Sequence, residues 1–161
     1  MKANGSVHKY GDNVDTDVII PARYLNSSDP KELAEKCMID IDKDFVNRVK
    51  PGDIMVANRN FGCGSSREYV MLLLLEARIR CVVAKSFSRG FYRACINQGL
   101  LPIVCNIQAE EGSLVQVDTV KGTVRVEDGK EHTFPPFPEL MMNIISEGGL
   151  INYFKKHGKL A

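Results

Sequence analysis

The chain has 161 residues, 44% hydrophobic and 25% charged, which is the composition of an ordinary soluble globular protein. Its 21 Lys and Arg residues nearly balance 20 Asp and Glu residues, and the formal net charge of +1 argues against a broad nucleic-acid-binding surface. No apolar run approaches the roughly 18 residues of a membrane span, and the polar N-terminus lacks the apolar core of a signal peptide. We therefore predict a single cytoplasmic domain, residues 1–161, with no nucleic-acid or membrane partner.

In chain order, the predicted elements of the first half are an extended strand at 18–20, a helix from residues 28–30, a short helix over 40–50 and a buried strand at 54–57. The first strand rests on the run Val18-Ile19-Ile20, which Pro21 ends. The first helix rests on a capping residue followed by Pro30, a residue that suits the first helical position.

The predicted elements of the second half are an apolar helix over 69–79, a buried strand at 81–84, a helix over 87–98, a strand at 100–105, antiparallel hairpins within 113–134 and closing helices over 138–149 and 150–158. Gly99 is the expected C-cap residue of the helix over 87–98. Alternating strands and helices in the middle of the chain favour a parallel core, to which the hairpins add antiparallel strands. The predicted fold class is α/β, with a mixed sheet and flanking helices.

The five cysteines are Cys37, Cys63, Cys81, Cys95 and Cys105. None shows the short spacing of zinc ribbons or ferredoxin-type clusters, and free thiols pack as small hydrophobic side chains. We therefore predict that this chain binds no metal of its own.

The run Asn60–Glu68, NFGCGSSRE, lies between a predicted strand and an apolar helix. Gly62 and Gly64 allow a tight turn and a close approach to a ligand. The N-terminus of the following helix and the guanidinium of Arg67 both favour an anion. The same run could also be a simple helix cap with a surface ion pair. A Ser-His-Asp hydrolase is disfavoured because the order G-C-G-S-S-R is not a nucleophile elbow.

Together with DNVDTDVIIPARYL and AKSFSRGFYRACINQGLLP, this run resembles the small subunits of 3-isopropylmalate dehydratase, the separate swivelling β/β/α domain of the aconitase superfamily. The resemblance extends from about Gly5 to Tyr153. It implies a two-subunit hydro-lyase of leucine biosynthesis that isomerises 2-isopropylmalate to 3-isopropylmalate. It also implies that this chain binds no cofactor, and that the large-subunit partner carries a 4Fe-4S cluster.

By this resemblance Ser65 matches the catalytic base and Asp17 an active-site acid. Ser66 and Arg67 match residues that bind a carboxylate of the dicarboxylate substrate, and Glu68 would be a partner of Arg67. Gly62 and Gly64 would shape the loop that presents these side chains.

Two positions set this chain apart from many relatives. Tyr69 follows the loop where a histidine is common. The loop at 24–28, which in this family helps to select the substituent of the substrate, contains Asn26 and has no arginine at 25–28, although Arg23 is nearby. Asn26 and Arg23 are therefore candidate substrate-binding residues, and the missing arginine favours an uncharged branched group.

Two alternatives remain open at this stage. One is a sister enzyme, the small subunit of a homoaconitase or a 2,3-dimethylmalate dehydratase. The other is a stand-alone anion-binding module without catalysis.

Overall fold

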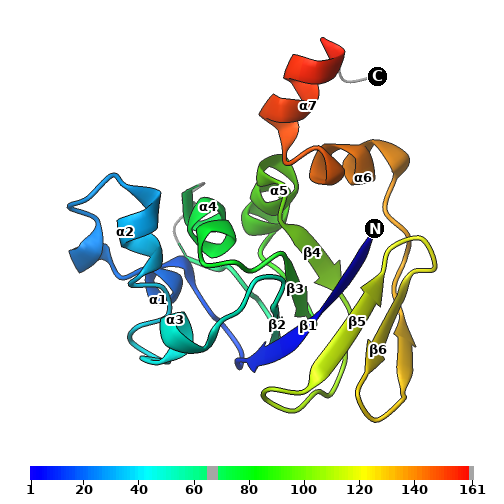
Figure 1. Cartoon of the computed structure of the whole chain (residues 1–161), viewed down its shortest axis with the longest axis horizontal. Coiled ribbons are helices and arrows are strands. Elements are labelled where there is room, and N and C mark those ends of the chain that lie inside the picture. The colour runs from blue at the N-terminus through cyan, green and yellow to red at the C-terminus, as the bar shows by residue number, and fades with distance from the viewer. Residues whose placement is uncertain (65–68, 160–161) are drawn as a thin grey trace.

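The computed structural model describes residues 1–64 and 69–159, which form one seven-stranded mixed sheet flanked by helices (Figure 1). The strand order is β4-β3-β2-β1-β5-β6-β7. The strands are β1 (Lys2–Lys9), β2 (Ile54–Ala57), β3 (Cys81–Ala84), β4 (Leu101–Val104), β5 (Leu114–Asp118), β6 (Thr123–Val126) and β7 (Glu131–Thr133). The mixed α/β class predicted from the sequence is confirmed.

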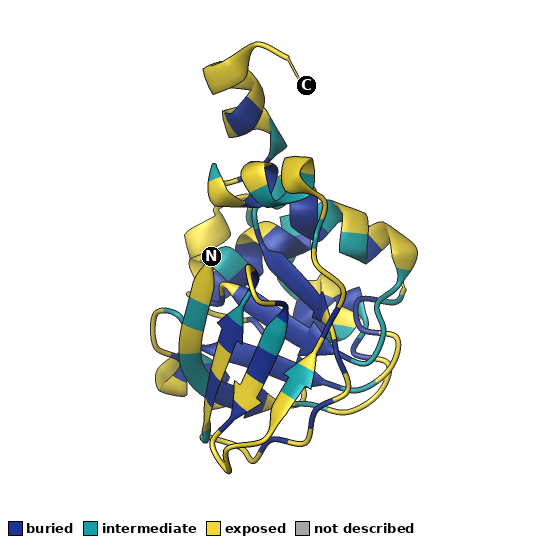
Figure 2. Ribbon diagram, turned by 90° about the vertical axis from the view of Figure 1, so that its right-hand side faces the viewer, coloured by how far each residue is buried: buried dark blue, intermediate teal, exposed yellow. Residues whose placement is uncertain are grey.

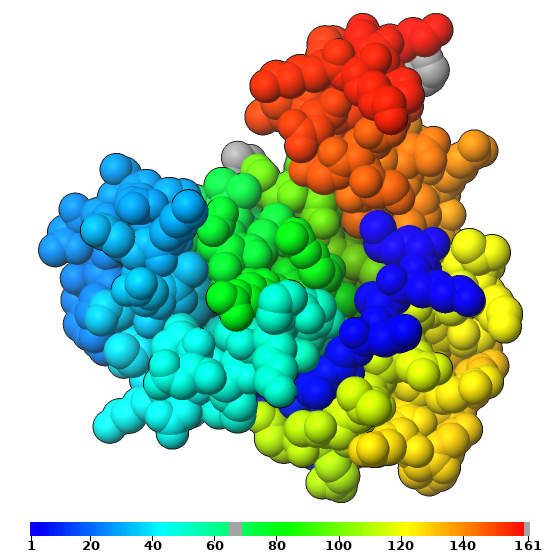
Figure 3. All heavy atoms as spheres, in the orientation of Figure 1, coloured from blue at the N-terminus to red at the C-terminus, as the bar shows by residue number. Residues whose placement is uncertain are grey.

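β1 joins the two halves of the sheet. It pairs in parallel with β2, which continues in parallel to β3 and β4. On its other side β1 pairs antiparallel with β5, followed by the antiparallel strands β6 and β7. The space-filling view shows the N-terminal strand as a band between the segment around residues 40–50 and the hairpins (Figure 3).

The helices are α1 (Thr16–Ile19), the 3-10 helix η1 (Ala22–Tyr24), α2 (Pro30–Ala34), α3 (Phe45–Arg48), α4 (Tyr69–Glu76), α5 (Arg89–Gln98), α6 (Glu139–Ser146) and α7 (Leu150–His157). The side chain of Asp29 caps α2 by accepting the N–H of Lys31, and Gly99 ends α5 in the left-handed conformation. No helix within the described residues is long and apolar enough to span a membrane.

Successive side chains of the buried strands point to opposite faces of the sheet, and each face carries its own hydrophobic core. In β2, Met55 and Ala57 join the core that packs under α1, α2 and α4, whereas Ile54 and Val56 join the core shared with β5, β6 and α6. Side chains on a strand point to alternate faces, so four consecutive buried residues serve both cores. Figure 2 shows the buried strands at the centre and the largely exposed α7 projecting from the body.

The prediction of a strand at 18–20 is wrong, because Thr16–Ile19 form the helix α1. The Asp15 carboxylate accepts the N–H of Val18 at 2.8 Å, and this N-cap outweighs the β-branched residues that follow. The helix predicted over 40–50 is shorter, with α3 covering only Phe45–Arg48. The strand β1 was not predicted.

Candidate functional site

Three loops meet where β1, β2 and β3 end, and backbone hydrogen bonds join them directly. The N–H of Asn13 donates to the carbonyl of Arg59 at 2.9 Å, and the N–H of Thr16 donates to the carbonyl of Cys63 at 3.0 Å. The loop after β3 joins the same group, because the N–H of Phe61 donates to the carbonyl of Ser86 at 3.0 Å. Ligands of α/β proteins bind at this edge of a parallel sheet.

Gly62 occupies a position that only glycine can fill. Its φ is +80°, and a Cβ there would lie 2.0 Å from Cγ of Phe91. Its N–H donates to the carbonyl of Val14 at 2.7 Å, and its carbonyl accepts the hydroxyl of Ser88 at 2.8 Å. Ser88 also caps α5, so this one glycine connects the loop after β1 with the start of α5.

Gly64 adopts a similar left-handed conformation, with φ of +91°. A Cβ at Gly64 would lie 3.2 Å from Cβ of Asp15, so the end of this loop lies against the start of α1. Asp17 is exposed in the first turn of α1. The structure therefore brings the predicted residues Gly62, Gly64 and Asp17 into one region.

The remaining residues predicted in this loop, Ser65, Ser66, Arg67 and Glu68, lie outside the described residues. Their two neighbours in the sequence are described: Gly64 beside α1, and Tyr69 at the start of α4.

The half-buried thiol of Cys63 lies inside the same loop. Burial raises its pKa, and the negative charge of Asp15 raises it further. A raised pKa reduces the thiolate fraction at neutral pH, so the local electrostatics do not activate this cysteine as a nucleophile.

Arg23 in η1 and Asn26 in the loop that follows it, the two candidate substrate-binding residues of this segment, are both exposed. Arg23 forms a bidentate pair with Asp40 and lies over the ring of Tyr24, 4.7 Å from its centroid. The guanidinium holds the pKa of the Asp40 carboxyl below its ordinary value. The arginine is thus engaged with a neighbouring acid in this structure.

An apolar pocket of about 310 Å³ lies between the loop at 24–28, α2 and the first turns of α4. Its lining includes the apolar residues Leu25, Leu33, Tyr69, Leu72 and Leu73, together with Ser27 and Ser28. Sequence reasoning singled out the loop and Tyr69 separately but did not predict that they share a pocket. The sequence feature that could have indicated this pocket is the run of apolar residues that starts at Tyr69.

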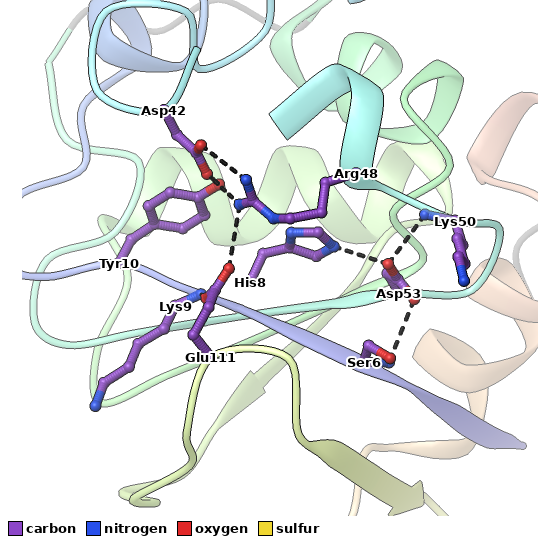
Figure 4. A network of polar contacts seen from close by, with 9 residues as sticks. All are labelled: Ser6, His8, Lys9, Tyr10, Asp42, Arg48, Lys50, Asp53 and Glu111. Atoms are coloured by element: carbon purple, nitrogen blue, oxygen red, sulfur yellow. Dashed lines mark hydrogen bonds and ion pairs between the residues drawn. The ribbon is translucent and has the colours of Figure 1, made fainter. Parts of the chain in front are cut away.

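A cluster of polar side chains joins the end of β1 to neighbouring segments (Figure 4). The buried ring of His8 is paired with the Asp53 carboxylate at 2.7 Å, and that carboxylate also accepts the N–H groups of Ser6 and Lys50 at 3.3 and 3.0 Å. The Asp53 side chain therefore ties β1 to the turn that precedes β2.

The residue after β1 extends this cluster. The hydroxyl of Tyr10 donates to Asp42 at 2.9 Å, and Arg48 forms a bidentate pair with the same carboxylate while also contacting Glu111 at 3.1 Å (Figure 4). Burial and the neighbouring carboxylate raise the pKa of the Tyr10 phenol, so it remains a donor. Arg48 holds the pKa of Asp42 below its ordinary value.

The described residues do not fit an iron–sulfur cluster. No group of three or more His, Cys, Asp or Glu side chains within them could hold a metal ion. The five thiols are free, and the four other than Cys63 are buried, Cys37 and Cys95 in one core and Cys81 and Cys105 in the other. Cluster ligation needs several converging thiolates, which this arrangement does not provide.

Comparisons with known proteins agree with this architecture. The family described as Aconitase C-terminal domain matches residues 3–108. The chain is 56% identical to the 3-isopropylmalate dehydratase small subunit of Lachnoclostridium phytofermentans, over 97% of each chain. It is 53% identical to that of Clostridioides difficile, over 96% of this chain and 98% of the relative.

A solved structure is also similar along nearly the whole chain. The crystal structure of a 3-isopropylmalate dehydratase protein from Methanocaldococcus jannaschii aligns with a TM-score of 0.93 at 44% identity. The alignment covers 98% of this chain and 96% of that one. The chain therefore belongs to the family of 3-isopropylmalate dehydratase small subunits, which share the aconitase C-terminal domain.

Proposed function

We propose that this chain is the small subunit of a hydro-lyase that converts 2-isopropylmalate into 3-isopropylmalate. Dehydration removes a proton and a hydroxyl group from adjacent carbons, and rehydration in the opposite sense moves the hydroxyl to the neighbouring carbon. The observation that carries this proposal is 56% identity along nearly the entire length of a relative with that name. The three interlocked loops that surround Gly62 support a site at the carboxyl edge of the sheet.

In the proposed site Ser65 takes the proton from the carbon beside a carboxylate. Arg67 and Ser66 bind a substrate carboxylate, because a guanidinium matches the planar geometry of that group. Asp17 acts as an acid of the site, and Glu68 orients Arg67. Support for this grouping comes from Gly64, which adjoins Ser65 in the sequence and contacts the start of α1 that carries Asp17.

We further propose that the large subunit completes this site and holds the iron–sulfur cluster. The name small subunit, carried by relatives of the same length, implies a second, larger chain. Because the described residues of this chain offer no ligand set for a cluster, the part proposed for this chain is limited to proton transfer and substrate binding.

The loop at 24–28 supports an alkyl-substituted substrate. Leu25 contributes an apolar wall to the pocket beside α4, whereas Arg23, the basic residue next to that loop, is paired with Asp40. A second substrate charge would need a free cation at this place. The pairing therefore favours 2-isopropylmalate over a tricarboxylate such as homoaconitate.

The proposal is tested by reconstitution with a cluster-loaded large subunit of this family. The chain alone should not turn over 2-isopropylmalate, whereas the pair should produce 3-isopropylmalate. In the pair, Ser65→Ala should lower kcat by roughly 10²–10⁴-fold, the usual contribution of a general base, while the affinity between the subunits stays unchanged. Turnover is measured by product chromatography and subunit affinity by calorimetry.

Ser146→Ala, at an exposed serine at the end of α6, is the matched control and should retain full turnover. Turnover by the isolated chain would overturn the two-subunit assignment. Normal turnover in Ser65→Ala would remove Ser65 from the role of base. A panel containing homoaconitate and 2,3-dimethylmalate separates the sister enzymes.

A further inference from the structure

The start of α5 lies at the rim of the candidate site and is followed by two arginines. Ser88, the N-cap residue of α5, donates its hydroxyl to the carbonyl of Gly62 at 2.8 Å. Arg89 and Arg93 are both exposed, and residues four apart lie on the same face of a helix. These two residues, the arginine pair, therefore extend from the rim along the exposed face of α5.

The arginine pair is unfavourable for α5 taken alone. A helix N-terminus carries partial positive charge, so acidic residues stabilise the first turn and a cation there does the opposite. The first turn of α5 begins with Arg89 and contains no acidic residue. Like charges four residues apart also repel each other. Within the described part of the chain, no Asp or Glu side chain pairs with either arginine, so the repulsion is not compensated.

The segment that contains α5 is basic as a whole. Residues 54–105 contain seven Lys and Arg residues but only two Asp and Glu residues, whereas the whole chain has 21 and 20. Lys85 adds a third cation near the rim, because its N–H donates to the carbonyl of Asn58 in the loop after β2 at 2.9 Å. Local rules of helix stability are broken most often at functional sites. The uncompensated charge therefore indicates a surface that meets negative charge in the working protein.

Aromatic side chains lie beside the arginine pair. The ring of Phe87 stacks on that of Phe91 with 6.4 Å between centroids, and it meets the ring of Tyr92 edge-on at 5.9 Å. Phe87 and Tyr92 remain half-buried rather than fully covered. Arginine and aromatic residues are enriched at protein–protein interfaces, and rings that are already packed lose little conformational freedom when a partner binds.

We propose that the arginine pair, together with Phe87 and Tyr92, forms a docking surface for an acidic face of the large subunit. The inference rests on the proposed function, since it assigns a place to the partner in that function. An acidic face would supply the counter-charge that α5 lacks. The hydrogen bond between Ser88 and Gly62 joins this surface to the candidate site, so a partner docked on α5 also reaches the rim of that site.

The occupant is a protein surface rather than a small dicarboxylate. Residues four apart are separated by about 6 Å along a helix axis, and the arginine pair lies on an exposed helix face. Charges spread over a helix face in this way attract a complementary protein surface and accelerate its association.

The test measures the association of the two subunits by stopped flow. The double variant Arg89→Glu/Arg93→Glu should lower the association rate constant at least about tenfold at low ionic strength, because electrostatic steering raises such rates by about 10–10³-fold. The difference from wild type should shrink as salt is raised towards 1 M, where the screening length is about 3 Å. The isolated variant should melt no lower than wild type, because acidic residues suit the start of a helix. Slower association together with undiminished stability excludes misfolding as the cause.

Arg78→Glu/Arg80→Glu is the matched control. It makes the same change in net charge at two exposed arginines that precede β3, whereas the arginine pair follows the other end of that strand. Association of this variant should stay within about twofold of wild type.

Equal losses in the two double variants would show a response to net charge alone and would overturn the docking surface. Unchanged association in the α5 variant would also overturn it while leaving the proposed function intact. If that unchanged association came with a raised KM for 2-isopropylmalate, the arginine pair would belong to the substrate instead. Failure of the wild-type subunits to associate would overturn the proposed function itself.

Discussion

Gly62 carries the contacts that hold three loops together, and its conformation leaves no place for a side chain. Gly62→Ala should lower the free energy of unfolding by at least about 2 kcal/mol. A left-handed residue with a Cβ costs about 1–2 kcal/mol, and here the added Cβ also overlaps the ring of Phe91. Urea denaturation measures the loss, and the amide of Gly62's neighbour Phe61 should exchange faster in the variant.

Gly112→Ala separates the cost of the left-handed conformation from the cost of the overlap with Phe91. Gly112 has the same φ of +80° but nothing within 4 Å of its Cβ position, so only the conformational cost of about 1 kcal/mol applies. Equal losses in the two variants would show that the contact with Phe91 contributes nothing.

The roles of some residues could be predicted from the sequence, whereas the contacts of others could not. The need for glycine at 62 and 64 was predictable, because a G-x-G turn before a helix requires positive φ. The pairing of Arg23 with Asp40 was not, because the two residues lie 17 positions apart and meet only after α2 folds back. Residues 65–68 carry the central functional prediction, and it stays a prediction.

Among the elements, α3 and the end of β1 are joined through one carboxylate. Arg48 lowers the pKa of Asp42 by hydrogen bonding, with help from Tyr10. A folded pKa below the unfolded value of about 3.9 gives stability that is present above that pH and is lost as pH falls through the folded pKa. Asp42→Asn should therefore cost about 1 kcal/mol at pH 7 and less at pH 3, which is below the unfolded pKa, as measured by urea denaturation at both values.

Asp40→Asn provides the comparison. Asp40 also has a lowered pKa and a bidentate arginine partner, but its pair is exposed and screened by water, so the unfolding midpoint should not change measurably at either pH. A pH-independent loss in Asp42→Asn would instead indicate a packing defect.

Elements defined by local patterns were predicted, and those defined by distant pairing were not. β2 and β3 were predicted at the correct residues because four buried apolar residues in a row suit a central strand. β1 contains Gly5 and several polar residues, so nothing local marks it. Its strand conformation comes from pairing with β2 and β5. At α1, one capping carboxylate overrode the apolar run that had indicated a strand.

For the whole molecule, the boundary of the family match does not coincide with a structural boundary. The Aconitase C-terminal domain match ends at residue 108, yet one core combines Val7 and Ile54 from before that point with Val115 and Val124 from after it. Truncation after Gln108 should therefore expose this core and the edge of β1, and the product should aggregate on size-exclusion chromatography.

Truncation after Gly149 should destabilise the fold less than truncation after Gln108. It removes α7, which buries Tyr153 but exposes most of its remaining surface. This product should stay monodisperse and unfold cooperatively at a lower temperature. A monodisperse, cooperatively unfolding chain 1–108 would contradict the shared core.

The position of β1 in the middle of the sheet also affects synthesis on the ribosome. Lys2 pairs with Asp118, so β1 needs a partner strand that is translated more than a hundred residues later. At 5–20 residues per second the wait is roughly 5–25 s. During that time one edge of β1 has no native partner, and pairing across so long a stretch of chain is slow. Nascent chains of this protein are therefore expected to depend on chaperones until the β5 hairpin has emerged.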